Sequence, residues 1–401
     1  MKHIVHITSV HKQSDVRIFV KECSSLVRSG FKVSLVVAGG KDEVLNGVRI
    51  YGVPALTHSR ILRFTKTVKS VVKKAISLQA DIYHLHDPEL LLQSKMLLMT
   101  GAKVVFDAHE DLPKQILNKT YLPAFVRPVL AKIVSKIEKY KISRISGVVA
   151  ATPLIGSKFL KINPNTCVVC NYPDLSDIKV KIDWERKQNE VCYIGGIFES
   201  RGAIQMLEAI ALNENVMLNL AGQYSPPILK EKLLKLKGWK NVIDWGFVDR
   251  LAICQILEKS KAGLVVLHPT ANYIESLPVK MFEYMAAGIP VIVSDFPILK
   301  EIIDTHECGI SVNPFNINEI SNAIKYLIDN PVEAKRMGSN GRMVVEKIFN
   351  WNHESLKLIQ FYDQQDAHNL NNIHVFYYVV QNVSYCYHHK ATRLHHNGLQ
   401  P

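Results

Sequence analysis

The stretch GLVVLHPTANYIESLPVKMFEYMAAGIPVIVS, residues 263–294, decides the fold. It begins with an apolar run of strand length at 263–267, which a polar loop separates from a helical pattern. The helix is predicted to open near Pro278 and to close at Gly288, because proline suits a first helical turn and glycine the position just past the end. A second apolar run follows at 290–293. A strand, a helix and a strand in this order predict a doubly wound α/β domain.

The loop and the helix of this stretch carry charged side chains where open α/β sheets bind ligands, beyond the carboxyl ends of the strands. Lys280 and Glu283 are three residues apart and therefore share one face of the helix. Glu275 in the loop and Glu283 form an E-x7-E pair. The spacing leaves two interpretations open: a cation and carboxylates that flank a ligand site, or a Lys280–Glu283 surface pair beside an unrelated Glu275.

The same alternation of strand-length runs and amphipathic helical stretches extends over most of the chain. Further strands are predicted at 3–9, 32–38, 81–86, 102–107, 147–151, 191–194 and 216–220. A polar, proline-bearing linker at 171–189 divides them. The sequence therefore predicts two doubly wound, Rossmann-like domains at 1–170 and 190–350.

The residues after 366 do not continue this pattern. The tail at 367–401 is rich in histidine: His368, His374, His388, His389, His395 and His396. A metal-binding tract is one interpretation, and an unstructured or altered terminus, such as a frameshift produces, is the favoured one.

Composition and charge narrow the class of protein. The chain has 401 residues, of which 47% are hydrophobic and 21% charged, as in globular proteins. No apolar run of membrane-spanning length and no leader are evident, so a cytoplasmic location is expected. Residues 1–170 carry 26 Lys and Arg against 11 Asp and Glu, whereas residues 171–401 carry 23 against 25. This asymmetry indicates an anionic partner for the first half.

Two stretches of the first half, 59–78 and 120–145, combine basic and apolar residues in a helical pattern. Each is predicted to form either a solvated face over a core or a helix that docks on anionic lipid. Nucleic acid is not expected as a partner, because no helix-turn-helix, zinc-finger or RNA-binding aromatic signature accompanies the charge.

A second candidate site is the loop that follows the predicted strand at 191–194, with Gly195, Gly196 and Arg201. Glycines let a backbone approach a ligand, and the next helix offers free N–H groups at its first turn, so a diphosphate is one candidate ligand. The sequence is neither GxGxxG nor a P-loop. A tight turn beside a solvated Arg201 is the alternative.

Histidines and carboxylates follow two strands of the first half. His84, His86 and Asp87 end one strand, and Asp107 and His109 end another. Residues of these types can bind a metal ion, but histidines at strand ends that form hydrogen bonds within the protein are the favoured interpretation. No D-x-D pair occurs, so phosphate binding without a metal and without a cofactor is expected.

The seven cysteines are scattered along the chain, and only Cys167 and Cys170 form a CxxC. That apolar stretch favours a buried strand with reduced thiols over a metal site, because no second cysteine pair or histidine pair lies at zinc-site spacing.

The segment 273–292, YIESLPVKMFEYMAAGIPVI, resembles the signature of the family-four retaining glycosyltransferases. Further similarity lies in DVRI at 15–18, HDPEL at 86–90, DAHE at 107–110, YIGG at 193–196 and DWGFV at 244–248. The resemblance covers residues 1–362 and implies the GT-B fold, in which two Rossmann-like domains enclose an active site in the cleft between them. It also implies a last helix, at 351–366, that returns to the first domain.

The resemblance assigns roles to matching residues. It implies that Glu283 binds the ribose of the donor nucleotide and that Glu275 faces the donor sugar. Arg201 takes the place of the lysine in the family's R-x4-K diphosphate clamp, and Gly196 replaces the clamp's arginine, which leaves Lys280 as the local substitute. Other implied donor-side residues are His109, Gly195, Phe247 and Val248. Those implied on the acceptor side are Asp15, Arg17, His86 and Asp87.

The resemblance implies a retaining, metal-independent transfer of a sugar from a nucleotide diphosphate to a saccharide that is linked to an isoprenoid lipid. The resemblance places such enzymes in capsule, O-antigen or exopolysaccharide synthesis at the inner face of the cell membrane. Two alternatives have different chemistry: a nucleotide-sugar 2-epimerase of the same fold, and a binding protein without turnover.

Overall fold

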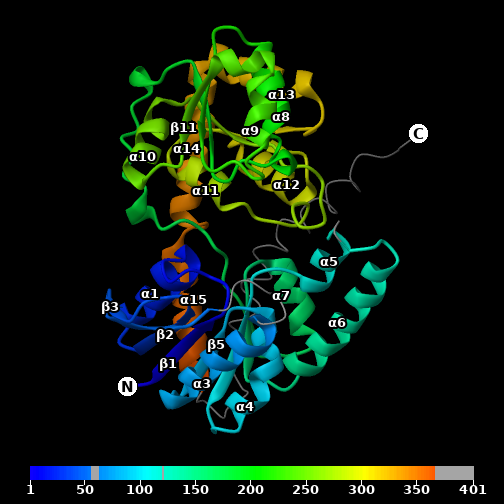
Figure 1. Ribbon diagram of the computed structural model, residues 1–401. Coiled ribbons are helices and arrows are strands. Elements are labelled where there is room, and N and C mark those ends of the chain that lie inside the picture. The colour runs from blue at the N-terminus through cyan, green and yellow to red at the C-terminus, as the bar shows by residue number, and fades with distance from the viewer. Residues whose placement is uncertain (56–62, 120–121, 366–401) are drawn as a thin grey trace, which may run out of the picture. The chain divides into compact units, whose positions relative to one another are not determined.

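The computed structural model describes residues 1–55, 63–119 and 122–365, and for Arg63 and Phe64 the backbone alone (Figure 1). The predicted basic stretches at 59–78 and 120–145 fall partly outside these residues. The histidine-rich tail lies wholly outside them.

The first region is built on an eight-stranded sheet with the order β3-β4-β2-β1-β5-β6-β7-β8. Its strands are β1 (His3–Thr8), β2 (Lys32–Ala38), β3 (Glu43–Leu45), β4 (Val48–Val53), β5 (Ile82–Leu85), β6 (Lys103–Ala108), β7 (Gly147–Ala150) and β8 (Thr166–Val168). All neighbouring pairs are parallel except β3 and β4, which form a hairpin.

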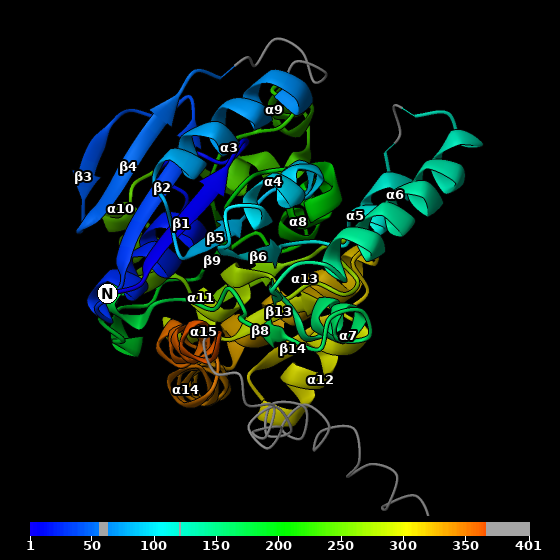
Figure 2. The same cartoon turned by 90° about the horizontal axis from the view of Figure 1, so that it is seen from below.

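Helices cover the faces of this sheet, and Figure 2 shows α3 and α4 together on one of them. The helical elements are η1 (Val16–Cys23), α1 (Ser24–Arg28), η2 (Arg63–Thr67), α3 (Val68–Ser77), η3 (Pro88–Gln93), α4 (Ser94–Leu98), α5 (Leu112–Leu117), α6 (Val126–Ile142) and α7 (Pro153–Leu160). Val5 and Ile7 of β1 share a core with Val68 and Val71 of α3. Side chains alternate along a strand, so His6 faces the opposite side, where η1 packs.

The second region contains a six-stranded parallel sheet with the order β11-β10-β9-β12-β13-β14. Its strands are β9 (Glu190–Ile194), β10 (Met217–Ala221), β11 (Val242–Gly246), β12 (Ala262–Val265), β13 (Val291–Ser294) and β14 (Gly309–Val312). Two short turns of 3-10 helix, η4 (Leu175–Asp177) and η5 (Trp184–Arg186), precede it.

The helical elements of the second region are η6 (Glu199–Arg201), α8 (Ala203–Ala211), α9 (Leu229–Leu234), η7 (Lys237–Asn241), α10 (Arg250–Lys259), α11 (Val279–Ala286), α12 (Pro297–His306), α13 (Ile317–Asp329) and α14 (Pro331–Lys347). The sequence explains these helices locally. In α13, Asn316 caps the first turn, and Ile320, Ile324 and Leu327 recur at helical spacing and are buried.

The last described helix is α15 (Trp351–Gln364). The Trp351 indole donates a hydrogen bond to Ser25 Oγ at 2.9 Å. The Glu354 carboxylate accepts one from the Cys170 backbone at 2.7 Å. Both partners belong to the N-terminal part of the chain.

The strand orders locate the ligand crevices. In the second sheet the chain runs outward from β9 to β10 and β11 and then returns to β12 on the other side of β9. The first sheet reverses in the same way between β1 and β5. Ligands of open α/β sheets bind beyond the carboxyl ends of strands at such switch points. The loops after β9 and β12 and the ends of β1 and β5 are therefore the expected ligand positions.

The predicted fold class is confirmed, and the predicted strands occur within two residues of their expected ends. The helix at α11 also starts and ends as expected, with Pro278 at its N-cap and Gly288 in the left-handed region at φ +70° just beyond it. Strands β3, β4, β11 and β14 were not predicted.

Candidate functional site

The loop after β9 begins with Gly195, whose φ of +125° favours glycine. A side chain at the neighbouring Gly222 would meet the Gly195 carbonyl oxygen at 1.9 Å, so two loops approach each other closely here. The Tyr284 hydroxyl of α11 accepts a hydrogen bond from Ile194 N at 2.8 Å and joins this loop to α11. The backbone at the end of β9 is therefore held in place beside the helix that carries Lys280.

Lys280 points at this loop from the first turn of α11. A Cβ built on Gly195 would lie 3.2 Å from Lys280 Nζ. The ammonium group lies 3.6 Å from the centre of the Tyr193 ring and has no hydrogen-bond partner among the described residues. Burial, with a contribution from Arg201, lowers the pKa of Lys280 well below its ordinary value. A buried amine next to an approachable backbone is suited to receive an anion.

Arg201, at the end of η6, reaches the same loop. Its Nη1 donates to the Gly196 carbonyl at 3.3 Å, and its Nε donates to the Tyr273 hydroxyl at 3.2 Å. Its guanidinium also lies over the Phe198 ring. The structure thus brings Lys280 and Arg201 together at Gly195 and Gly196 from elements about 80 positions apart in sequence.

Glu283 lies one turn after Lys280 on α11. Its carboxylate pairs with Arg250, at the start of α10, at 3.0 Å, and its side chain is 26% exposed. The Glu283 carboxylate is therefore paired with a cation but remains accessible to a ligand. Phe247, in the loop after β11, is 80% exposed, and Val248 packs partly against the core of this region. Glu275 is partly exposed in the loop that precedes α11.

A second group of polar side chains lies at the carboxyl ends of β1, β5 and β6. Asp107 is fully buried and accepts two hydrogen bonds from Arg17, at 3.0 and 2.9 Å. His109 Nε2 lies 2.9 Å and His86 Nδ1 lies 3.3 Å from Asp107 Oδ2. Burial opposes ionisation of Asp107, but Arg17 and the two histidines hold its pKa well below the usual range. Asp107 is an anion that orients both rings.

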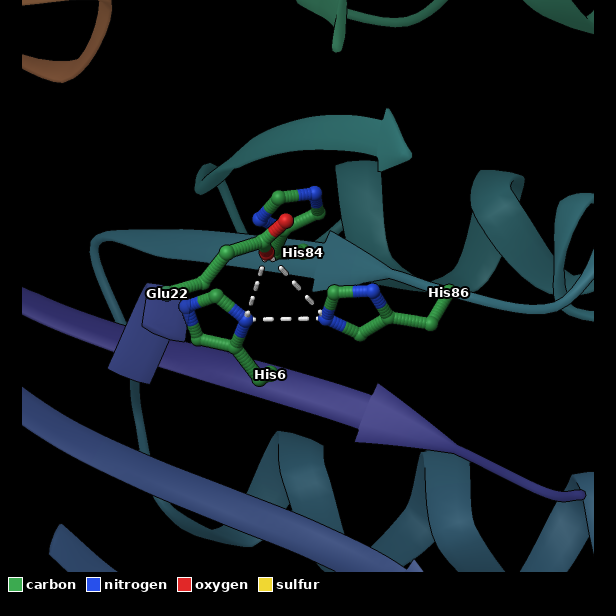
Figure 3. A group of neighbouring side chains, drawn as sticks. All are labelled: His6, Glu22, His84 and His86. Atoms are coloured by element: carbon green, nitrogen blue, oxygen red, sulfur yellow. Dashed lines mark hydrogen bonds and ion pairs between the residues drawn. The ribbon is translucent and has the colours of Figure 1, made fainter. Parts of the chain in front are cut away.

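Behind His86, three more buried residues meet, His6, His84 and Glu22 (Figure 3). His6 Nδ1 lies 2.9 Å from His86 Nε2. Burial lowers the pKa of His6 and of His84 well below the ordinary value, so these rings are neutral. Burial and the neighbouring Asp107 raise the pKa of Glu22.

The residues that the resemblance assigns to the acceptor side have structural partners. Asp15 caps η1 by accepting a hydrogen bond from Ile18 N. Arg17 is buried between Asp107 and Glu22 and also donates to the Val169 carbonyl. Asp87 accepts hydrogen bonds from Thr8 and Ser9 and pairs with His11 at 3.0 Å.

A pocket of about 510 Å³ opens beside this group in the first region. His86, Asp107 and His109 line one part of it, and Ile137 and Lys141 of α6 line another. The pocket therefore joins a polar wall of histidine and carboxylate to an apolar and basic helix.

The sequence did not identify several residues of these sites. Tyr193, Tyr273 and Tyr284 shape the surroundings of Lys280 and Arg201, but aromatic residues in strands and helices resemble ordinary core. His6 and Glu22 lie far from His86 in sequence. Strand alternation places His6 opposite the Val5 and Ile7 core face, and this was the signal that could have singled it out.

Comparisons with known proteins agree with this architecture. The family model "Glycosyltransferase Family 4" matches residues 17–176, and "Glycosyl transferases group 1" matches residues 175–344. The chain is thus a glycosyltransferase of the GT-B fold. The two matches together span residues 17–344.

Individual relatives are distant. The chain is 25% identical over 173 residues to the MMP alpha-(1->4)-mannosyltransferase of Mycolicibacterium hassiacum, an alignment that covers 42% of this chain and 41% of the relative. It is 22% identical over 376 residues to an uncharacterised glycosyltransferase of Methanocaldococcus jannaschii, covering 84% of this chain and 90% of the relative. The solved structure of Anabaena HepE in complex with UDP and glucose has a TM-score of 0.71 at 14% identity and covers 91% of this chain and 100% of that one.

Proposed function

We propose that this glycosyltransferase takes its sugar from a nucleoside-diphosphate donor held at the carboxyl ends of β9 and β12. The observation that carries the proposal is the convergence of Lys280 and Arg201 on the Gly195–Gly196 backbone, with Lys280 Nζ lacking a hydrogen-bond partner among the described residues. An arginine, and a lysine that an anion would protonate, beside a backbone that a ligand can approach closely match a diphosphate. The UDP in the HepE structure supports this donor class.

In the proposed reaction, bond breaking at the donor sugar leaves negative charge on the diphosphate. Arg201 and Lys280 would stabilise that charge as donors already in position, a type of contribution worth roughly 3–4 kcal/mol per group in enzymes. Glu283 would accept hydrogen bonds from the ribose hydroxyls. His109 and Glu275 would face the donor sugar. The departing phosphate would take the acceptor's proton on the same face, which gives retention without a bound metal.

For the acceptor we propose a saccharide on an isoprenoid lipid, bound in the pocket that His86, His109 and Ile137 line. The support is α6, which exposes apolar side chains on the region that carries the excess positive charge. These side chains are Phe125, just before the helix, and Val129, Ile133, Ile137 and Tyr140 within it. Exposed lysines, Lys132, Lys136 and Lys139, accompany them. Apolar side chains interleaved with lysines suit the surface of an anionic bilayer.

The proposed location is therefore the inner face of the cell membrane, in the synthesis of capsule, O-antigen or exopolysaccharide. Within the described part of the chain, none of the helices is both long and apolar enough to cross a bilayer. The attachment that we propose is peripheral.

The proposal is tested by a thermal-shift series with UDP, GDP, CDP and TDP, followed by a hydrolysis assay with the sugar form of the stabilising nucleotide. A nucleotide at 100 times its dissociation constant stabilises a protein by about 2.7 kcal/mol, which is readily measured. We expect one nucleotide to stabilise the wild type and not the Lys280→Met variant. Stabilisation without donor turnover would identify a binding protein, and a changed donor sugar without acceptor would identify an epimerase.

A further inference from the structure

The buried group His6, Glu22, His84 and His86, called the histidine cluster below, brings together three elements of the first region. His6 lies on β1, Glu22 lies on η1, and His84 and His86 lie on β5 and directly after it. All four side chains are buried, and they lie at the switch point between β1 and β5 (Figure 3). β1 and η1 follow one another in sequence, but β5 lies far beyond them, so the cluster forms only in the folded chain.

Three of its atoms lie close enough together to contact one ion. His6 Nδ1 and His86 Nε2 are 2.9 Å apart, and they lie 3.9 and 4.0 Å from Glu22 Oε2. The point equidistant from the corners of such a triangle lies about 2.1 Å from each, which is the length of a zinc–nitrogen or zinc–oxygen bond. His84 supplies a fourth ligand atom, and the four atoms lie within 4.8 Å of one another.

Glu22 supplies an independent reason to expect a ligand. Its carboxyl group is fully buried beside Asp107, and neither oxygen makes a well-aligned hydrogen bond among the described residues. Oε1 faces Arg17 Nε at 3.1 Å as an ion pair, whereas Oε2 faces the histidines. Buried polar atoms are rarely left in this state, and an ion is one of the few explanations.

The surroundings of His86 match those of a metal ligand. Its Nε2 faces His6 and Glu22, and its Nδ1 lies 3.3 Å from Asp107 Oδ2. Histidines that bind metals commonly donate the other ring N–H to a carboxylate, which fixes the ring and raises its basicity. Arg17 in turn fixes Asp107 with two hydrogen bonds.

We propose that the histidine cluster binds one divalent transition-metal ion, with Zn²⁺ as the best match. Three imidazoles and one carboxylate suit zinc, whereas magnesium and calcium prefer oxygen ligands alone. Four protein ligands leave no open position, so the ion is structural. It would link β1, η1 and β5 and, through His86 and Asp107, hold His109. This site is separate from the donor site, where no metal is invoked.

The test measures zinc in the full-length protein after chelation, dialysis and re-addition of Zn²⁺. Because the histidine-rich tail can bind metal in every variant, the measured quantity is the difference from wild type. We expect Glu22→Gln and His84→Gln to hold one zinc fewer per chain. His3→Gln is the matched control, because His3 is a buried histidine of β1 that bonds Ser34 outside the cluster. His109→Gln tests the neighbouring group of His86, Asp107 and His109. Both should keep the wild-type content.

A second measurement does not depend on the folding of the variants. Co²⁺ added to the wild type should give the strong visible absorption of a four-coordinate site with nitrogen and oxygen ligands, and Zn²⁺ should displace it. Absence of this absorption overturns the proposal, as does equal zinc in the wild type and both ligand variants. Loss of zinc in His109→Gln with retention in Glu22→Gln would also overturn it, because the ion would then belong to the neighbouring group.

Discussion

Binding of a nucleoside diphosphate is expected to take up a proton, and Lys280 is the group that receives it. In the free protein, burial and the charge of Arg201 lower the pKa of Lys280 well below its ordinary value of 10.5. The Tyr193 ring, whose centre lies 3.6 Å from Nζ, opposes this lowering, because a cation over an aromatic face gains about 2 kcal/mol in a desolvated site. An anion placed against Nζ raises the pKa again.

The sign and size of the effect follow from this shift. Between the lowered pKa of the free protein and the higher pKa of the complex, the complex holds more protons, so affinity rises as pH falls. One linked proton changes the dissociation constant by at most tenfold per pH unit, about 1.4 kcal/mol. The measurement is made above about pH 7.5, where the terminal phosphate, with a second pKa of about 6, no longer titrates.

The assay is calorimetry of UDP binding in buffers that differ in their enthalpy of protonation. We expect uptake of up to one proton in the wild type and none in Lys280→Met, which keeps the volume of the side chain but cannot titrate. Arg201, Cys192 and Glu283 act electrostatically on Lys280, the Tyr193 ring lies against its Nζ, and the variant leaves all four residues in place. Equal proton uptake in both proteins, or tight binding by the wild type without uptake, would refute the reasoning.

The same variant has an opposite effect on stability. The unfolded chain protonates Lys280 at its ordinary pKa and the folded protein does not, so the free energy of unfolding rises with pH between the lowered pKa and 10.5. Each unit of that lowering costs about 1.4 kcal/mol at pH values below both pKa values. Lys280→Met should therefore raise Tm at neutral pH while it weakens diphosphate binding.

Three further outcomes are expected. Glu283→Gln should weaken nucleotide binding by roughly one to two orders of magnitude, since charge-assisted hydrogen bonds contribute about 1.5–3 kcal/mol. Calorimetry on a variant with an unchanged circular dichroism spectrum checks this prediction. Unchanged affinity contradicts it. Gly263→Ala places a Cβ 2.2 Å from the Tyr284 ring and should lower the free energy of unfolding by about 1–3 kcal/mol or more, as urea titration would show; wild-type stability contradicts it. Co-sedimentation should find binding to anionic vesicles that weakens with added salt, because the screening length falls from about 10 Å at 0.1 M to about 3 Å at 1 M. The double variant Lys132→Glu/Lys136→Glu should bind more weakly than the wild type. Equal binding to neutral vesicles argues against an electrostatic attachment.

The fold could be predicted because its signals are local. Apolar runs bounded by glycine and proline gave the central strands of both sheets within two residues. The hairpin of β3 and β4 also had a local signal, Asn46-Gly47, with both residues at positive φ, 52° and 76°. This pair is typical of a two-residue hairpin turn. The hairpin was not predicted because β3 is three residues long and exposed, so its sequence shows no alternation of apolar and polar residues.

The donor site could be predicted only in part. Local patterns indicated a glycine loop with Arg201 and a helix with Lys280, and the switch point of the sheet brings them together. The low pKa of Lys280 could not be predicted, because it depends on burial under Tyr193 and on Arg201 from a different element. Contacts between residues far apart in the chain produce no regular residue spacing in the sequence from which they could be predicted.

The resemblance and the structure assign different roles to Arg17. Arg17 belongs to a motif that the resemblance assigns to the acceptor side. In the structure, its Nε and Nη2 bond Asp107 and its Nη1 bonds the Val169 carbonyl, so these donors are used inside the protein. Removing Arg17 would leave the buried Asp107 carboxylate with only the two histidines as partners, and breaking a buried ion pair costs about 3–5 kcal/mol. We therefore expect any effect of an Arg17 substitution on activity to act through Asp107, the side chain that orients His109 beside the pocket.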